Sequence, residues 1–222
     1  MTLINFAAFV PLSTVDDFGY STAVVFFRGC NLNCWYCHNK RFTHGDTLVD
    51  VSVIKQKIKD SSKFVSSVTF SGGESLLQPE ALEELIDYTH SLGLKVCLYT
   101  SGDEPANLKQ VIHKVDRLYI DFKMEQCGME FENYDQYLRN FIRTLSISED
   151  GSVEVIVTCV VFDTNADTVD EVEEIKCFTG SLMFVITQGI HETHNVMTPE
   201  QMKTAFKGCY IRTKENGVEW NG

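Results

Sequence analysis

Short apolar runs alternate six times along this chain with segments whose apolar residues recur at helical spacing. The predicted strands are Thr22–Phe27, Val68–Phe70, Lys95–Tyr99, Leu118–Phe122, Val153–Phe162 and Leu182–Thr187. The predicted helices are Val51–Phe64, Pro79–Leu92, Ala106–Lys114, Tyr134–Leu145, Thr168–Phe178 and Pro199–Phe206. This alternation is typical of an α/β protein with a mostly parallel sheet and outer helices. Six units are too few for an eight-fold barrel, so an open doubly wound sheet or an incomplete barrel is expected.

The domain organisation predicted from the sequence is a single unit spanning residues 1–222. No internal repeat, linker or shift in composition divides the chain. Hydrophobic residues make up 44% and charged residues 23%, which excludes a disordered or low-complexity chain. After the last predicted helix, Tyr210–Trp220 is expected to add a hairpin strand.

The charge of the chain is acidic, with 19 Lys and Arg against 31 Asp and Glu and a net charge of −12. Nucleic acids and anionic membranes need clustered basic residues, so neither is expected as a partner. The longest apolar stretch, Val153–Phe162, is shorter than the roughly 20 residues that span a bilayer. The first residues lack the basic start of a signal peptide. We therefore expect a cytoplasmic protein.

Three of the eight cysteines lie close together, at Cys30, Cys34 and Cys37 in the loop 29–39. Three thiolates around one centre suit zinc or an iron–sulfur cluster. A structural zinc site needs four ligands, and here the fourth would have to be His38 or a distant cysteine. Three cysteines alone leave one iron of a [4Fe–4S] cluster open to an external ligand. The other cysteines, which we expect to be ordinary structural residues, are Cys97, Cys127, Cys159, Cys177 and Cys209.

Unusual polar segments follow five of the six predicted strands. They are the cysteine loop, Ser71–Glu74, Thr100–Gly102, Asp121–Lys123 and Gln188–His194. The carboxyl ends of parallel strands meet at one rim, where α/β proteins build their sites. The sequence therefore predicts that these segments form one site.

The C-x3-C-x2-C spacing after the first strand, with Tyr36 directly before the third cysteine, resembles the radical S-adenosylmethionine (SAM) superfamily. The Ser71–Glu74 segment, SGGE, is similar to the glycine-rich segment that follows the second strand in that superfamily. The resemblance covers essentially the whole chain and implies a partial (β/α)6 barrel. It also implies that the three cysteines hold a [4Fe–4S] cluster whose open iron binds SAM. An electron from the cluster would break the sulfonium–C5′ bond and yield a 5′-deoxyadenosyl radical.

The same resemblance assigns a set of SAM-binding residues, which are Tyr36, Gly72, Gly73, Glu74, Ser101, Asp121 and Lys123. The two glycines would let the backbone approach the SAM ammonium group closely. Glu74 would anchor that loop or accept a hydrogen bond from the same amine, and Tyr36 would meet the adenine. Ser101, Asp121 and Lys123 would bind the ribose hydroxyls and the carboxylate. The alternatives are a capping serine and a solvated ion pair.

Three local features are similar to the activating enzymes of glycyl-radical enzymes. They are Cys37-His38-Asn39, the Val10–Asp16 lead strand and turn, and Asp121-Phe122-Lys123. Among these enzymes the resemblance is greatest to the activating protein of anaerobic ribonucleotide reductase. It implies hydrogen abstraction from a glycine of that partner enzyme, with a flavodoxin or ferredoxin as electron donor. No catalytic residue beyond the cluster and SAM is then required.

Several positions depart from this pattern or stay open. Ser75 stands where the family commonly has proline, and Tyr99 stands where some activating enzymes have an aspartate that helps bind a monovalent cation. His191 could contact SAM or the partner, or be a lone surface histidine. Two alternative functions are a radical SAM enzyme acting on a small molecule, like 7-carboxy-7-deazaguanine synthase, and a non-enzymatic iron–sulfur or zinc binding module.

Overall fold

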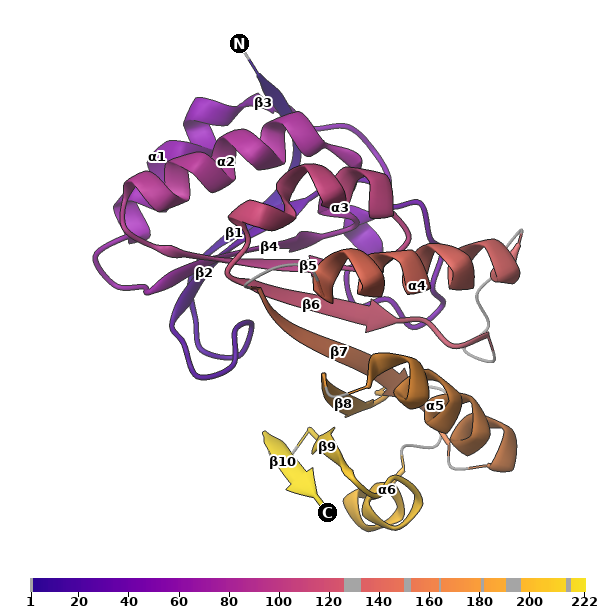
Figure 1. The fold of residues 1–222 in the computed structure, drawn as a ribbon. Coiled ribbons are helices and arrows are strands. Elements are labelled where there is room, and N and C mark those ends of the chain that lie inside the picture. The colour runs from indigo at the N-terminus through magenta and orange to yellow at the C-terminus, as the bar shows by residue number, and fades with distance from the viewer. Residues whose placement is uncertain are drawn as a thin grey trace.

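The structure of the protein is a computed structural model that describes residues 2–125, 133–149, 153–163, 165–180, 182–190, 197–214 and 217–222. His191 and Cys127, both singled out in the sequence, lie outside the described residues. Figure 1 shows a strongly twisted sheet with helices gathered along one side of it.

The described residues contain ten strands that form one sheet. They are β1 (Leu3–Ser13), β2 (Thr22–Phe27), β3 (Leu48–Asp50), β4 (Ser67–Gly72), β5 (Lys95–Thr100), β6 (Arg117–Phe122), β7 (Glu154–Val161), β8 (Met183–Gln188), β9 (Cys209–Arg212) and β10 (Val218–Asn221). Their order across the sheet is β10-β9-β8-β7-β6-β5-β4-β2-β1-β3. Neighbouring strands from β2 to β9 are parallel, whereas β1, β3 and β10 pair antiparallel at the two edges.

Six α-helices follow the parallel strands within the described part of the chain. They are α1 (Val51–Ser61), α2 (Pro79–Ser91), α3 (Pro105–Val111), α4 (Tyr134–Glu149), α5 (Ala166–Thr179) and α6 (Pro199–Ala205). Asp50, Asn165 and Thr198 cap α1, α5 and α6 by accepting hydrogen bonds from backbone N–H groups. The six strand–helix units predicted from the sequence are therefore confirmed.

The strand order decides between the two architectures that the sequence left open. From β2 to β9 the parallel strands follow one another across the sheet without a reversal, apart from the short edge strand β3. Right-handed crossovers in one continuous direction place every helix on the same face. A doubly wound sheet instead reverses its strand order and carries helices on both faces. The fold is therefore a partial (β/α)6 barrel with outer helices.

The alternation of side chains along β6 shows how the two faces of the sheet differ. Leu118, Ile120 and Phe122 pack into the large core beneath the helices. Tyr119 points the other way, into a smaller core on the inner face that also holds Cys97, Ile156 and Val185. Polar groups that face inward on the same strand are thus directed into the interior of the barrel.

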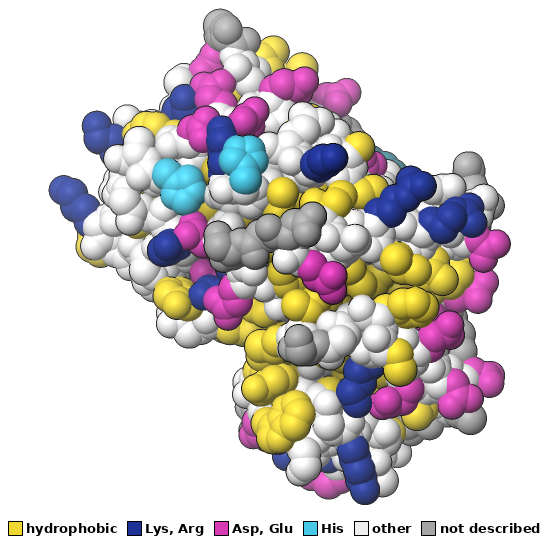
Figure 2. Space-filling view, in the orientation of Figure 1, with side chains coloured by type: hydrophobic (Ala, Val, Ile, Leu, Met, Phe, Trp, Pro, Cys, Tyr) yellow, Lys and Arg dark blue, Asp and Glu magenta, His cyan; other side chains and the backbone are white. Residues whose placement is uncertain are grey.

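The outer face carries charged groups of both signs, which Figure 2 shows interspersed over the helices. Some of them form ion pairs between neighbouring elements, such as Lys55 with Glu84 at 2.7 Å and Lys114 with Glu83 at 2.8 Å. Such exposed pairs contribute little to stability individually.

The edges of the sheet differ most from the sequence prediction. The lead strand β1 begins at Leu3 and is longer than the Val10–Asp16 segment suggested, and β3 was not predicted. The expected hairpin is present as β9 and β10, which pair antiparallel. No helix in the part of the chain that the structure describes is both long and apolar enough to cross a membrane.

Candidate functional site

The carboxyl ends of the parallel strands surround a cavity of about 300 Å³. The residues predicted from the sequence that line it are Cys30, Cys34, Tyr36, Cys37, Gly72, Gly73, Ser101, Asp121 and Lys123. Glu74, the remaining predicted residue, is 2% exposed and does not line the cavity. The fold thus brings together predicted residues that lie up to 93 positions apart in the sequence, from Cys30 to Lys123.

The cysteine loop begins after β2 and is held in place from its own base. The guanidinium group of Arg28 donates to the carbonyl oxygens of Arg41 and His44, both at 3.0 Å. The backbone N–H of Gly29 donates to the carbonyl of Phe42 at 2.9 Å. These bonds close the loop into a compact lobe that directs its three thiols into the cavity.

All three thiols of the loop are at least partly buried. Burial raises the pKa of Cys30 to about 12 and also raises the pKa of Cys34, where Lys123 opposes the effect. Cys30 and Cys34 therefore stay protonated until a metal displaces the proton. Among the described residues, no three His, Cys, Asp or Glu side chains meet as closely as the ligands of a single ion. An iron–sulfur cluster instead binds each cysteine at a different iron, so thiols spread around a shared cavity fit it.

Gly72 and Gly73 form the part of the wall that meets the cysteine loop. Gly72 has a φ of 129°, and a Cβ atom there would lie 2.3 Å from the carbonyl oxygen of Phe27. A Cβ atom on Gly73 would lie 1.9 Å from the carbonyl oxygen of Gly29. Their neighbouring backbone groups bond across the same contact, since the Gly73 N–H donates to Phe27 at 3.0 Å. No other residue type can occupy these positions without moving the backbone.

Glu74 joins two loops behind the cavity wall. Its carboxylate accepts hydrogen bonds from the backbone N–H and the hydroxyl of Ser101, both at 2.9 Å, and from the Thr100 hydroxyl at 3.0 Å. It also accepts from the backbone N–H of Leu76 at 3.2 Å. Burial raises the pKa of this carboxyl, and the hydrogen bonds oppose the rise. This geometry favours the anchoring role of Glu74 over direct contact with a ligand.

Asp121 and Lys123 face the cavity from the end of β6. The Lys123 ammonium group pairs with one carboxylate oxygen of Asp121, and the Thr158 hydroxyl donates to the other at 2.9 Å. The side chain of Lys123 is 12% exposed, and its ammonium group lies 5.7 Å from the centre of the Tyr36 ring. Burial lowers the pKa of Lys123, but Asp121, Tyr36 and Cys34 together outweigh this effect, so the pKa lies well above its ordinary value. The pair is therefore a largely buried, charged feature of the cavity rather than a solvated ion pair.

Tyr137 of α4 was not predicted as a site residue, yet it connects two of the loops. Its hydroxyl accepts from the backbone N–H of Lys123 at 2.8 Å and donates to the carbonyl of Ser101 at 3.2 Å. In the sequence Tyr137 is one of several aromatic residues on the buried face of α4, so nothing marked it out. Its role depends on a hydroxyl whose partners lie on two other elements.

An aromatic wall was also not predicted in full. Phe162, which follows β7, lies with its ring centre 5.1 Å from that of Tyr36 and 4.6 Å from that of Trp35. Phe162 and Tyr36 both line the cavity. The wall gives the cavity a flat apolar surface next to the Lys123 ammonium group.

Comparisons with known proteins agree with this geometry. The family described as "Radical SAM superfamily" matches residues 24–124. The pyruvate formate-lyase-activating enzyme of Clostridium pasteurianum is 30% identical over 171 residues, which cover 74% of this chain and 71% of that enzyme. The 7-carboxy-7-deazaguanine synthase of Methanothermobacter thermautotrophicus is 24% identical over 189 residues, or 82% of this chain and 72% of the relative. The chain spans about half the length of several other activating enzymes that it matches.

The fold is likewise similar to a solved structure of TYW1 with a lysine-pyruvate adduct bound. That likeness has a TM-score of 0.63 at 15% sequence identity and covers 83% of this chain and 71% of the other. A partial barrel with a cysteine loop and a glycine-rich wall at one rim defines a radical SAM enzyme. The chain belongs to the radical SAM superfamily, and several of its relatives are named as glycyl-radical enzyme activating enzymes. Members of this family use a [4Fe–4S] cluster and SAM, so a non-enzymatic binding module is not supported.

Proposed function

We propose that this protein generates a glycyl radical on a partner enzyme after reductive cleavage of SAM. The observation that carries the proposal is the single cavity shared by the cysteine loop, the glycine-rich wall and the Asp121–Lys123 pair. The similarity to the pyruvate formate-lyase-activating enzyme of Clostridium pasteurianum supports the same conclusion.

The cluster would be held by Cys30, Cys34 and Cys37. Three thiolates leave one of four irons without a protein ligand, and the amino and carboxylate groups of SAM suit that position. When bound, the cluster supplies one electron that breaks the sulfonium–C5′ bond, and the resulting 5′-deoxyadenosyl radical takes the α-hydrogen atom of a glycine. The protein itself then contributes binding, orientation and exclusion of water, and no side chain acts as an acid or base.

The other cavity residues would bind SAM. Lys123 is positioned to neutralise the SAM carboxylate, because Asp121 keeps it protonated and turned into the cavity. The wall of Tyr36 and Phe162 offers an apolar surface for the adenine ring. Gly72, Gly73 and Ser101 would present polar groups to the amine and the ribose, and Glu74 would hold their loops together.

The partner would be a glycyl-radical enzyme, and we favour anaerobic ribonucleotide reductase. The electron donor would be a flavodoxin or ferredoxin. The net charge of −12 favours a partner with a basic docking surface. We further propose that residues 1–222 form a single radical SAM core domain that acts in the cytoplasm, without nucleic-acid or membrane partners.

A radical SAM enzyme acting on a small molecule is the second candidate, supported by the likeness to 7-carboxy-7-deazaguanine synthase. A carboxylated small substrate would need several cationic contacts in an enclosed pocket. Among the described residues that line the cavity, Lys123 and His38 are the basic side chains. This supply of positive charge is small once SAM is bound, which favours the first candidate.

The test is anaerobic reconstitution with iron and sulfide, followed by reduction, addition of SAM and mixing with anaerobic ribonucleotide reductase. We expect release of 5′-deoxyadenosine and a glycyl doublet in the electron paramagnetic resonance (EPR) spectrum of the partner. Cys34→Ala should abolish both signals and lower the iron content. Cys177→Ala, which removes an exposed cysteine of α5, is the matched control and should leave both intact. Release of 5′-deoxyadenosine without a glycyl signal on any glycyl-radical enzyme would refute the proposal.

A further inference from the structure

The inner face of β6 carries a row of polar and aromatic side chains at every second position. The row is Arg117, Tyr119 and Asp121, and Lys123 continues it directly after the strand ends. Asp121 and Lys123 line the cavity, and Tyr119 and Arg117 lie successively further from it along the strand. Tyr119 is therefore the first residue of this row that lies deeper in the barrel than the cavity.

Tyr119 supports a second tyrosine that does line the cavity. Tyr99 on β5 is the direct neighbour of Tyr119 in the parallel ladder. The two rings are stacked, with centres 4.3 Å apart and planes inclined by 1°. Tyr119 is 0% exposed, whereas Tyr99 is partly exposed. The stacked pair thus separates the cavity from the interior of the barrel.

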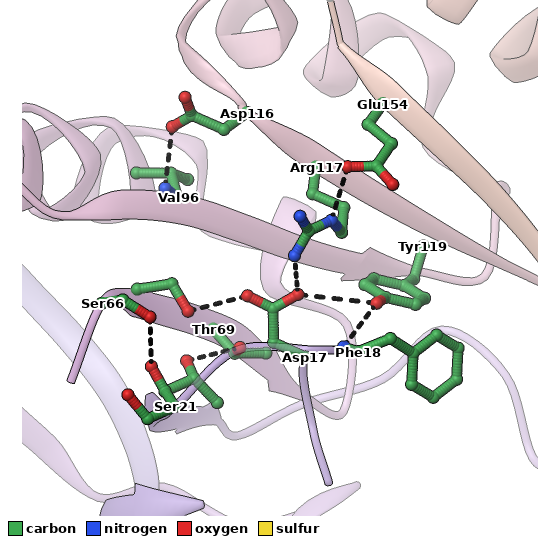
Figure 3. A network of polar contacts seen from close by, with 12 residues as sticks. Asp17, Phe18, Ser21, Ser66, Thr69, Val96, Asp116, Arg117, Tyr119 and Glu154 are labelled. Atoms are coloured by element: carbon green, nitrogen blue, oxygen red, sulfur yellow. Dashed lines mark hydrogen bonds and ion pairs between the residues drawn. The ribbon is translucent and has the colours of Figure 1, made fainter. Parts of the chain in front are cut away.

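The ring of Tyr119 is fixed by the segment that joins β1 to β2, as Figure 3 shows. The Tyr119 hydroxyl accepts from the backbone N–H of Phe18 at 3.0 Å and makes a longer contact of 3.5 Å with the Asp17 carboxylate. Asp17 is 1% exposed, pairs with Arg117 and accepts from the Ser67 hydroxyl at 2.7 Å. The ring of Phe18 packs edge-on against Tyr119 with centres 5.4 Å apart. Contacts from several elements therefore set the height and tilt of Tyr119.

We propose that Tyr99, held flat on Tyr119, is a specificity-determining residue that sets the depth of the cavity. The cavity of about 300 Å³ lies at the lower end of the ~300–1,000 Å³ that small-molecule pockets occupy. The cluster held by the three thiols of this cavity and one SAM molecule would together fill such a space, and the stacked tyrosines close the route to any deeper space. The reacting carbon of the second substrate must then arrive through the mouth, on a segment that protrudes from a larger molecule. This inference rests on the proposed function. It explains why the enzyme would act on a segment of a larger molecule and not on a second small molecule inside the cavity.

The test compares Tyr99→Ala with Tyr99→Phe, which keeps the ring and removes only the hydroxyl. Tyr99→Ala opens space beside Tyr119, so SAM should bind more weakly. The change that SAM binding produces in the EPR spectrum of the reduced cluster should then also differ from that of the wild type. The yield of glycyl radical per 5′-deoxyadenosine should fall about tenfold or more. The reason is that a shift of SAM on the order of 1 Å from its reactive position lowers the rate of hydrogen abstraction by up to ~100-fold. Tyr99→Phe should keep the SAM affinity and the EPR spectrum of the cluster near the wild-type values. It should also keep the coupling, which is the yield of glycyl radical per 5′-deoxyadenosine, near the wild-type value.

Tyr99→Leu is the second variant if Tyr99→Ala does not fold, since it keeps apolar volume without a flat ring. Tyr119→Leu should produce the same loss of coupling although it does not touch the cavity directly. Wild-type SAM affinity and wild-type coupling in a folded Tyr99→Ala or Tyr99→Leu protein would overturn the inference and leave the proposed function standing. If the wild type forms no glycyl radical, the proposed function fails. The SAM dissociation constants and the cluster spectra of the variants then still test whether Tyr99 sets the depth of the cavity.

Discussion

The side-chain amide of Asn39 donates a hydrogen bond to the carbonyl oxygen of Gly72 at 3.2 Å. Asn39 follows the last cysteine of the loop after β2, and Gly72 ends β4. The cysteine loop and the glycine-rich wall, which the sequence marked separately, are therefore one connected unit. Placement of the cluster and placement of SAM should depend on each other.

Asn39→Ala tests this connection. A net loss of about 1 kcal/mol per hydrogen bond should raise the SAM dissociation constant about fivefold, while the iron content stays near that of the wild type. Equilibrium dialysis of the reconstituted protein measures the first quantity and iron analysis the second. Gln56→Ala, on an exposed part of α1, is the matched control. An unchanged dissociation constant in Asn39→Ala would show that the two segments are independent.

Gly73→Ala should prevent proper assembly of the rim. Its Cβ atom would meet the Gly29 carbonyl oxygen at 1.9 Å, and backbone cannot yield as a flexible side chain does. We expect a loss of at least ~1–3 kcal/mol in the free energy of unfolding and little bound iron after reconstitution. Gly217→Ala is the control, because nothing lies within 4 Å of a Cβ atom there. Normal iron binding by Gly73→Ala would contradict the close contact.

Tyr137→Phe removes the hydroxyl that joins Lys123 to Ser101. One buried and one partly buried backbone group lose a partner, so the free energy of unfolding should fall by about 1–3 kcal/mol. The KM for SAM should rise more than kcat falls, since the change affects binding groups and not the cluster. Tyr134→Phe is the matched control on the same helix, because it removes a bond to Glu171 instead. Equal kinetic effects of the two variants would contradict a specific role for Tyr137.

Asp17→Ala should destabilise the protein by up to about 3–5 kcal/mol, because the Arg117 guanidinium group loses its buried partner and keeps the exposed carboxylate of Glu154 at 2.9 Å. Urea unfolding measures the loss, and Asp60→Ala on the exposed surface of α1 is the control. The double variant Asp17→Ala with Arg117→Met should recover part of the stability. No recovery in the double variant would mean that the hydrogen bond from Ser67 to Asp17 matters more than the ion pair.

Glu171→Gln should change how stability depends on pH. Burial raises the pKa of the Glu171 carboxyl, while hydrogen bonds from Glu125 and Tyr134 oppose the rise. Between its ordinary and raised pKa, the folded protein keeps a proton that the unfolded chain releases, so this group lowers stability as pH rises through that window. The variant should therefore gain stability relative to the wild type as the pH rises from about 4, near the ordinary pKa of a glutamate carboxyl.

The measurement for Glu171→Gln is urea unfolding across that pH range. Glu174→Gln, at an exposed position of the same helix, reports the effect of removing one negative charge from α5. A difference between Glu171→Gln and the wild type that does not vary with pH would contradict the inference.

Local patterns were sufficient to predict most of the fold. The strands and helices of the six units lie within a few residues of their predicted bounds because each has its own apolar period and turn residues. The shared location of the cysteine loop, Gly72 and Lys123 also followed from the sequence, because parallel strands end at one rim. Edge strand β3 was missed because its three residues are too few to show an alternation of apolar and polar side chains.

The contacts that position the site could not be predicted in this way. Glu74 reaches Ser101, and Tyr137 reaches both Ser101 and Lys123, across distances in sequence that no local pattern records. The stacking of Tyr99 on Tyr119 depends on the register between β5 and β6. The only sign of it in the sequence is a tyrosine at the inward position of each strand.

The alternation along β6 has a consequence for changes in chain length. Arg117, Tyr119, Asp121 and Lys123 face inward because each is two positions from the next. Deleting or inserting one residue near the middle of this strand would turn part of the row toward the helices and bring Leu118, Ile120 or Phe122 into the barrel. The strand should therefore tolerate exchanges of side chains far better than any change in its length.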